Sequence, residues 1–252
     1  MRQEKLHKVL ARAGYGSRRQ LEQWIAEGRI QVDDQTAQIG QRIDCQQPPR
    51  IVLDRRPLSL AAMLEENCRV LAYYKPEGEI CSHHDPQQRP TLFSRLPRLS
   101  KGRWISIGRL DLNSSGLVLL TNDGELANRL MHPRYQIQRQ YAVRVFGQVT
   151  TEQLQRLRQG VQLADGLACF ESIRDQGGEG RNHWFTVTLR EGRNREVRRL
   201  WQSQGITVSR LLRIGYASVK LPKSLSRGRW YELSSMEINR LRQQVGFSIT
   251  AL

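Results

Sequence analysis

The stretch Gly108-Arg109-Leu110-Asp111-Leu112-Asn113-Ser114-Ser115-Gly116 runs directly into the apolar residues 117–120. The apolar run predicts a buried strand, so the carboxylate of Asp111 lies on the turn that leads into it. An ionised carboxylate that is desolvated alone costs free energy, and we therefore expect a basic partner for it. An isolated Asp-x-Asn-Ser turn is more often structural, so the rest of the chain has to decide its role.

The charge of the chain indicates a polyanionic partner. Lys and Arg number 40 against 24 Asp and Glu, which gives a formal net charge of +16 over 252 residues. A surplus of this size is typical of nucleic-acid-binding proteins. The sequence has no apolar run long enough to span a bilayer and no signal peptide, so we expect a cytoplasmic protein without a membrane partner.

Residues 4–54 have the pattern of a small module with two helices. Apolar residues recur at helical spacing over 6–13, and Gly14-Tyr15-Gly16 interrupts them. Ser17 and Gln20 match a capping box at the start of a second helix, which Gly28 can end. A strand over 29–32, a turn at Asp33-Asp34 and a strand over 39–43 complete the prediction.

Basic residues gather on the first helix and at the start of the second. On charge alone a solvated face would be the usual explanation, but a helix N-terminus also attracts phosphate through its free N–H groups. Residues 4–50, with the core K-V-L-A-R-A-G-Y-G-S-R-R, resemble the alpha-L RNA-binding module of the S-four type found in ribosomal proteins. We therefore expect RNA contacts from Lys5, Lys8, Arg12, Ser17, Arg18 and Arg19.

The hydrophobic pattern is interrupted at Cys45-Gln46-Gln47-Pro48-Pro49 and again at Arg55-Arg56-Pro57, which predicts a linker over about 45–65. We expect residues 1–60 to form the RNA-binding module with its linker and residues 65–252 to form a second domain. In that domain strands are predicted over 70–74, 117–120, 141–146, 184–189 and 209–214, and helices over 124–131, 152–158 and 196–204. Ser234 and Glu237 match another capping box. The expected fold class is α+β with a largely antiparallel sheet.

A second basic cluster, E-G-R-N-R-E-V-R-R at 191–199, starts on a loop after a strand and continues into a helix. Its guanidinium groups are able to pair with Asp111 and with phosphates. No Gly-rich loop has the spacing for a nucleotide cofactor, so we expect a reaction without ATP or NAD. The four cysteines have no C-x-x-C pairing, which favours neither a disulfide framework nor a metal site.

The chain from end to end resembles the ribosomal pseudouridine synthases that carry an N-terminal alpha-L module, most of all their large-subunit branch. The strongest signatures are G-R-L-D-L-N-S-S-G-L-V-L-L-T-N-D-G and E-G-R-N-R-E-V-R-R-L-W. The segments A-Y-Y-K-P-E-G-E, E-L-A-N-R-L-M-H-P and Y-A-V-R-V-F-G-Q-V match that branch. The resemblance implies a pseudouridine synthase catalytic domain after the RNA-binding module.

The resemblance also implies an activity and its residues. The enzyme would isomerise one uridine of large-subunit (23S) ribosomal RNA, or of its assembly intermediate, to pseudouridine, as a monomer without cofactor or metal. Asp111 would be the catalytic carboxylate, Tyr141 would stack on the flipped uracil, and Arg198 would pair with Asp111. Arg109 would lie near the gap left by the extruded nucleotide. Further RNA contacts are expected from Arg193, Asn194, Arg195 and Arg199.

Elementary chemistry agrees with a single carboxylate. The isomerisation consumes no water and involves no redox change, whereas glycoside hydrolases need a second carboxyl group to activate the entering water. Asp111 could attack the anomeric carbon, stabilise an oxocarbenium ion or remove a sugar proton, and the sequence does not choose among these.

Two other functions fit parts of the sequence. A ribosome-assembly factor that binds RNA without catalysis shares the basic surface and gives Asp111 a structural role. A metal-dependent nuclease would use Asp111, Asp123 and His132, although no compact carboxylate cluster supports it. His132-Pro133 is better explained as the end of the helix over 124–131.

Overall fold

The computed structural model describes residues 3–60, 68–83, 85–100 and 102–247. The chain divides into two compact units. The first contains residues 1–68 together with 97–105 and 122–124, and the second contains 69–96, 106–121 and 125–252. The segments 97–105 and 122–124 fall inside the range expected for the second domain. Within the described part of the chain, no helix has the length and apolar character needed to cross a membrane.

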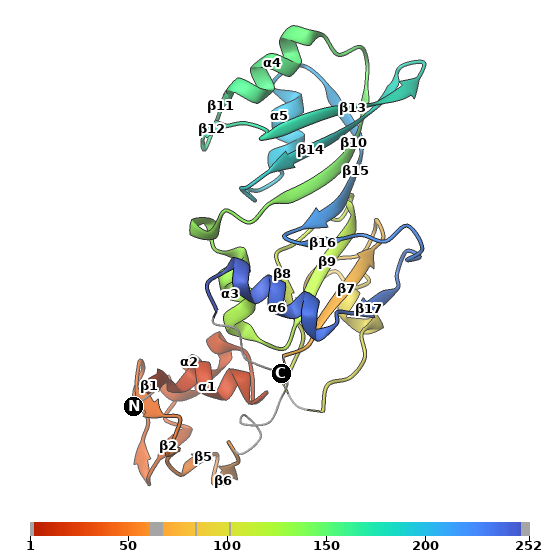
Figure 1. Cartoon of the computed structure of the whole chain (residues 1–252). Helices are drawn as coiled ribbons and strands as arrows, with labels where there is room; N and C mark the ends of the chain where they lie inside the picture. Colours follow the sequence, from red (N-terminus) through yellow and green to blue (C-terminus); the bar gives the residue numbers. More distant parts are fainter. Residues whose placement is uncertain (1–2, 61–67, 84, 101, 248–252) are drawn as a thin grey trace. The chain divides into compact units, whose positions relative to one another are not determined.

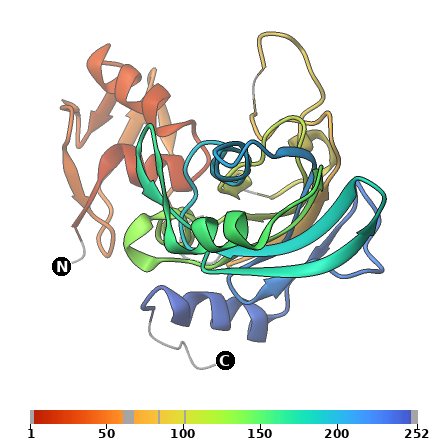
Figure 2. The same cartoon turned by 90° about the horizontal axis from the view of Figure 1, so that it is seen from above.

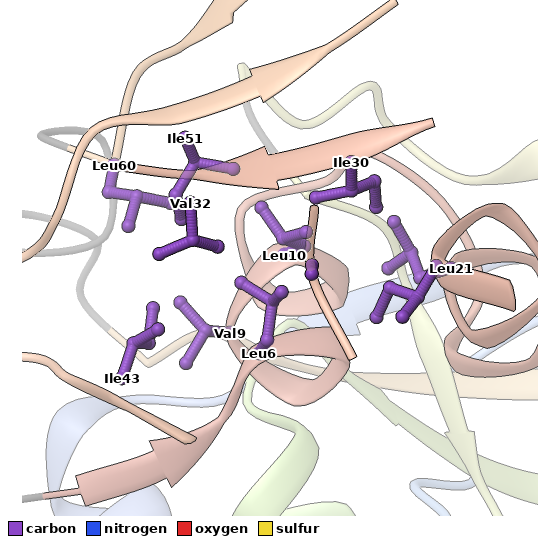
Figure 3. Packing of buried hydrophobic residues seen from close by; sticks show 11 residues of the cluster. Leu6, Val9, Leu10, Leu21, Ile30, Val32, Ile43, Ile51 and Leu60 are labelled. Atoms are coloured by element: carbon purple, nitrogen blue, oxygen red, sulfur yellow. The ribbon is translucent and has the colours of Figure 1, made fainter. Parts of the chain in front are cut away.

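The two helices predicted for the first unit are present, and both are short. They are α1 (Leu6–Arg12) and α2 (Arg18–Ala26). The capping box is confirmed, because the Gln20 backbone N–H donates to Ser17 Oγ over 3.1 Å and the Gln20 side chain accepts from the Ser17 N–H. Leu10 and Leu21 are fully buried in an apolar core that the helices share with the strands of this unit (Figure 3).

The predicted linker over 45–65 is wrong in its middle part. β5 (Ile51–Leu53) and β6 (Arg56–Leu58) form a hairpin there, and β5 pairs with β2 (Ile30–Val32) in the sheet order β3-β2-β5-β6, where β3 is Gln35–Thr36. The physical reason is that Ile51 is buried in the core of this unit, which the flanking prolines and arginines concealed in the sequence pattern. Residues 61–67 of the predicted linker lie outside the described residues.

The strand predicted over 39–43 is displaced. The strand found there is β4 (Arg42–Asp44), which pairs with β1 (Gln3–Lys5) at the start of the chain. Ile39 is 67% exposed and lies outside any strand. The strand was predicted to start too early because Ile39, an apolar residue, lies on a short exposed loop.

A nine-stranded sheet forms the centre of the second unit (Figure 1). Its main order is β13-β14-β10-β15-β9-β7-β17, with β16 pairing β15 and β8 pairing β9. The pairs along the main order are antiparallel except β9 with β15, and β16 is antiparallel to β15, so the expected α+β class with a largely antiparallel sheet is confirmed. The five predicted strands are found as β7 (Val70–Lys75), β9 (Ser115–Thr121), β10 (Arg139–Phe146), β14 (Asn182–Leu189) and β15 (Thr207–Tyr216).

Several strands of this unit were not predicted. β13 (Ser172–Glu179) is exposed along most of its length and contains Gly177-Gly178, so it carries no hydrophobic alternation. It is held by backbone pairing to β14 instead. The other unpredicted strands are β8 (Ile105–Ile107), β11 (Val161–Leu163), β12 (Gly166–Ala168), β16 (Val219–Lys220) and β17 (Trp230–Glu232).

The predicted helices of the second unit are present. They are α3 (Gly124–Met131), α4 (Thr151–Gln159), α5 (Glu196–Gln202) and, after the confirmed capping box of Ser234 and Glu237, α6 (Ser235–Gln244). Trp201 of α5 packs on Phe185 of β14, with 5.1 Å between ring centroids. In Figure 2, α4 lies along the curved β13–β14 side of the sheet. α5 covers the sheet face to which Tyr141 of β10 belongs, because Tyr141 and Phe185 both occupy buried positions on that face and Trp201 packs on Phe185.

Candidate active site

A cleft of about 480 Å³ opens on the second unit and brings together both predicted signatures. The first signature reaches it through the turn before β9, and the second through the loop that leads into α5. Tyr141 reaches it from β10. Among the predicted site residues, the cleft is lined by Arg109, Asp111, Tyr141, Arg193, Asn194 and Arg195.

The turn that carries Asp111 is fixed by a buried lysine. The Ser114 N–H donates to the Asp111 carbonyl over 3.1 Å, which closes the turn. Lys75, at the end of β7, is fully buried and its Nζ donates to the carbonyls of Pro76, Asp111 and Ser114 at 2.9, 3.1 and 2.8 Å. Burial lowers the pKa of Lys75, and three carbonyl acceptors compensate part of the cost of burying its charge. Through these bonds the end of β7 holds the turn of Asp111.

Tyr141 and its neighbours on the adjacent strands β15 and β9 lie on the same face of the sheet. It is 8% exposed and pairs with Arg213 of β15, and Arg213 in turn pairs with Gly116 of β9. Cross-strand partners direct their side chains to the same face of a sheet. The sheet therefore places a tyrosine, an arginine and the end of the Asp111 turn in one lateral row.

The ion pair of Asp111 differs from the prediction. The carboxylate, 33% exposed, is 3.8 Å from the guanidinium of Arg195, whereas Arg198 was expected to pair with it. Arg198 donates instead to the carbonyls of Asn113 and Val208, at 2.8 and 3.0 Å. Burial lowers the pKa of Arg198, and the negative charge of Asp111 partly offsets that effect. Arg198 therefore attracts the Asp111 carboxylate electrostatically without an ion pair, and it binds the Asp111 turn through the Asn113 carbonyl.

Arg195 owes its position to an unusual backbone conformation. It has φ of 50°, in the left-handed region, and it is the N-cap of α5 without a side-chain cap. For a residue with a side chain this conformation costs about 1 kcal/mol or more. From this position the Arg195 guanidinium lies 3.8 Å from the Asp111 carboxylate.

The remaining arginines of the cluster are tied to a neighbouring hairpin. Arg193 donates to the carbonyls of Asp165 and Leu167, at 3.3 and 2.8 Å, and Arg199 makes a two-pronged ion pair with Asp165 at 2.8 and 2.7 Å. That pair lowers the pKa of Asp165. Both arginines thus anchor the β11–β12 hairpin beside the cleft, and Arg199 does not line the cleft itself.

Glu196 is a buried carboxylate that the sequence analysis did not single out. It lines the cleft from the first turn of α5, is 4% exposed, and accepts the Arg193 N–H over 3.1 Å. Burial raises its pKa. A raised pKa in the folded state means that stability is fully present at acidic pH and is lost as the pH rises through that pKa.

We expect Glu196→Gln to stabilise the protein at neutral pH by about 1 kcal/mol, because the amide keeps an acceptor for the Arg193 N–H without a buried charge. The difference from the wild type should shrink as the pH falls toward the ordinary range of a glutamate. Thermal unfolding between about pH 5 and pH 8 measures this. The control is Glu179→Gln at an exposed glutamate of β13, and a stability gain of Glu196→Gln that does not vary with pH would contradict the assignment.

In the first unit, the predicted RNA-contacting residues have different surroundings. Arg12 and Lys8 face Glu4, at 3.1 and 3.8 Å, so their charge is partly neutralised. Lys5 precedes α1, Ser17 uses its hydroxyl oxygen as the α2 cap, and Arg18 and Arg19 form the first turn of α2. Arg18 and Arg19 are both exposed.

No group of three or more His, Cys, Asp or Glu side chains within the described residues is arranged to hold a metal ion. His132 caps the short 3-10 helix Pro133–Tyr135 by accepting the Arg134 N–H over 3.2 Å, and α3 ends before it as predicted. The thiol of Cys81 lies against the backbone of Leu110, and burial raises its pKa.

Comparisons with known proteins show the family of this chain. Residues 69–203 match the family model described as RNA pseudouridylate synthase, and residues 4–44 match the S4 domain. The chain is 58% identical over 243 residues to the ribosomal large subunit pseudouridine synthase B of Pasteurella multocida (strain Pm70), covering 96% of this chain and 70% of that protein. It is 55% identical over 242 residues to the synthase B of Escherichia coli (strain K12), covering 96% and 83% of the two chains.

A solved structure has the same fold. The crystal structure of a pseudouridylate synthase superposes with a TM-score of 0.65 at 24% identity, covering 94% of this chain and 99% of that one. With the family model matched over more than half of the chain, and with relatives above half identity along nearly the whole chain, the protein belongs to the RNA pseudouridylate synthase family and carries an N-terminal S4 domain.

Proposed function

We propose that this protein isomerises a specific uridine of large-subunit (23S) ribosomal RNA to pseudouridine in the cytoplasm, with Asp111 as the catalytic carboxylate. The observation that carries the proposal is the meeting of Asp111, Tyr141 and Arg195 around one cleft within the family domain. The identity to two synthases named for the large ribosomal subunit supports the choice of RNA.

The chemistry explains why these groups suffice. The bond between C1′ of the ribose and N1 of the uracil breaks, the uracil rotates, and C5 bonds to C1′. The proton on C5 is lost and N1 gains one, so atoms and electrons balance without a cofactor. The Asp111 carboxylate would act on the sugar, by attack at C1′, by stabilising positive charge there, or by removing a sugar proton.

The target base has to leave the helix stack before this reaction, because a stacked uridine hides its sugar from the enzyme. Tyr141 supports this step, since a largely buried aromatic ring beside the carboxylate offers a stacking face for an extruded uracil. Arg109 and Asn194, which also line the cleft, would contact the RNA around the vacated position.

The proposal is tested by incubating the protein with a fragment of large-subunit ribosomal RNA in the presence of EDTA. Nuclease digestion and mass spectrometry of chemically labelled pseudouridine then locate any product. We expect one modified position, formed without added metal or cofactor. RNA that binds the protein but stays unmodified, in folded fragments and in assembly intermediates, would instead support a non-catalytic assembly factor.

The S4 domain should provide affinity and not chemistry. We expect Arg18→Glu with Arg19→Glu to weaken RNA binding roughly 10-fold or more at moderate salt. The slope of the logarithm of the binding constant against the logarithm of the salt concentration should become less steep, by the amount expected for the loss of about one to two phosphate contacts. Turnover at saturating RNA should stay near that of the wild type. Filter binding across a salt series and single-turnover assays measure both effects, with Arg18→Lys and Arg19→Lys as the charge-conserving control. An equal loss of turnover at saturation would contradict this division.

A further inference from the structure

Arg213 is the most deeply buried cation of the cleft, and the reaction as described above gives it no role. It lies on β15 between Tyr141 and Gly116 and is 2% exposed. Its Nε donates to the Leu117 carbonyl over 2.7 Å, and its Cζ is 5.1 Å from the centroid of the Tyr216 ring. These two contacts fix the plane of the guanidinium.

Among the residues that the structure describes, the charge of Arg213 has no matching anion. Its Nη2 is buried without a hydrogen-bond partner, and no carboxylate of the described residues lies within 4.0 Å of the guanidinium. Burying a cation in this way is unfavourable unless a hydrogen-bonded partner compensates it. Arg213 nevertheless lines the cleft that Asp111 and Tyr141 line.

Arg139 provides the comparison. It also lines the cleft, is 9% exposed, and its Cζ lies at the same 5.1 Å from the Tyr216 ring. Its Nη1, however, donates to the carbonyls of Ile137 and Arg190, at 2.7 and 2.9 Å. Arg139 therefore donates its Nη1 protons to carbonyls of the protein, whereas the Nη2 group of Arg213 has no acceptor and can donate to a ligand in the cleft.

We propose that Arg213 stabilises the negative charge that appears on the uracil when its bond to the ribose breaks, an inference that rests on the proposed function. The electron pair of the C1′–N1 bond stays on the uracil and spreads over N1, O2 and O4. A guanidinium held in place before the reaction lowers the energy of that anion without reorganising. Arg213 transfers no proton; after C5 has bonded to C1′, N1 gains a proton from water and the proton of C5 is released to water.

The test compares substrates whose uracils differ as leaving groups. RNA with 5-fluorouridine at the target position releases a more stable anion than RNA with uridine, so it needs less help from a cation. We expect Arg213→Gln to slow single-turnover loss of the target uridine by roughly 100-fold or more, the scale of one preorganised donor. The rate ratio of 5-fluorouridine to uridine should rise about 10-fold over the wild-type ratio, with RNA affinity unchanged.

Control variants separate this role from a structural one. Arg139→Gln should lower stability and leave the 5-fluorouridine to uridine ratio as in the wild type. Arg213→Lys, which keeps the charge, should keep a ratio close to that of the wild type. A folded Arg213→Gln protein with the wild-type ratio would overturn the inference while leaving the proposed function intact.

Two outcomes cover the remaining cases. A wild-type protein that rearranges no uridine refutes the proposed function, and the role of Arg213 falls with it. If Arg213→Gln does not fold, the test uses the wild-type protein instead and measures its inhibition by free 5-nitrouracil. This compound ionises more readily than uracil. The inhibition should strengthen as 5-nitrouracil becomes anionic with rising pH and exceed that by neutral uracil; equal inhibition by the two would overturn the inference.

Discussion

Asp111→Asn should reduce the single-turnover rate of pseudouridine formation by about 10⁴-fold or more, the scale on which single essential catalytic groups act. Asparagine has nearly the same shape and can take the same place in the turn, because Lys75 and Ser114 bind the backbone carbonyl of Asp111 and not its side chain. What is lost is the negative charge, the nucleophile and the base. All three candidate mechanisms require at least one of these.

RNA binding by Asp111→Asn should equal or slightly exceed that of the wild type, because a partly exposed negative charge next to the polyanion has been removed. The matched control is Asp175→Asn in the β13–β14 hairpin, where the carboxylate pairs with His183 and is 58% exposed. That variant should modify RNA at the wild-type rate. Product formation by Asp111→Asn within about 10-fold of the wild type would exclude Asp111 as the catalytic carboxylate.

The position of Asp111 could be predicted because all the necessary information is contiguous. Its turn is followed directly by the fully buried strand β9, and strand signals of this kind depend on neighbouring residues alone. The strand that carries Tyr141 was predictable for the same reason, since β10 alternates between buried and more exposed positions along its whole length, whereas the role expected of Tyr141 came from the family resemblance alone. The helix boundaries followed from capping boxes, which are also local.

The partners of these residues could not be predicted in the same way. The choice between Arg195 and Arg198 depends on a left-handed residue at the start of α5, which the Arg-rich sequence does not reveal. Arg213 joins the site only because β15 pairs in parallel with β9, a strand about a hundred residues earlier in the chain. Charged residues such as Lys75 and Glu196 are mostly exposed in proteins, so their burial is known only from the tertiary structure.

Gly116→Ala should destabilise the second unit by about 3–5 kcal/mol, the range reserved for changes that disrupt the interior. Gly116 has φ of 111°, and a Cβ there would lie 2.3 Å from the Arg213 carbonyl oxygen and 2.5 Å from its backbone nitrogen. Backbone atoms cannot move aside as a flexible side chain can. The strands β9 and β15 pair through two residue pairs, Ser115 with Leu212 and Gly116 with Arg213. The added methyl group would therefore disturb one of these two pairs directly.

Gly147→Ala is a closely matched control, because Gly147 has φ of 114° and nothing within 4 Å of the added Cβ. It should cost only the backbone strain, about 1–2 kcal/mol. Urea unfolding followed by tryptophan fluorescence, to which the buried Trp201 of the same unit contributes, measures both variants. Equal destabilisation would show that backbone conformation alone demands glycine at 116.

The same substitution also tests how the sheet assembles the site. Asp111 precedes β9, whereas Tyr141 and Arg213 lie on β10 and β15, so the β9–β15 contact joins the two groups of residues. Folded Gly116→Ala protein should therefore lose turnover on RNA at temperatures well below its unfolding midpoint, and Gly147→Ala should retain it. Full turnover by folded Gly116→Ala would mean that the cleft tolerates a shift between β9 and β15, and that its geometry is held chiefly by the Asp111 turn and Lys75.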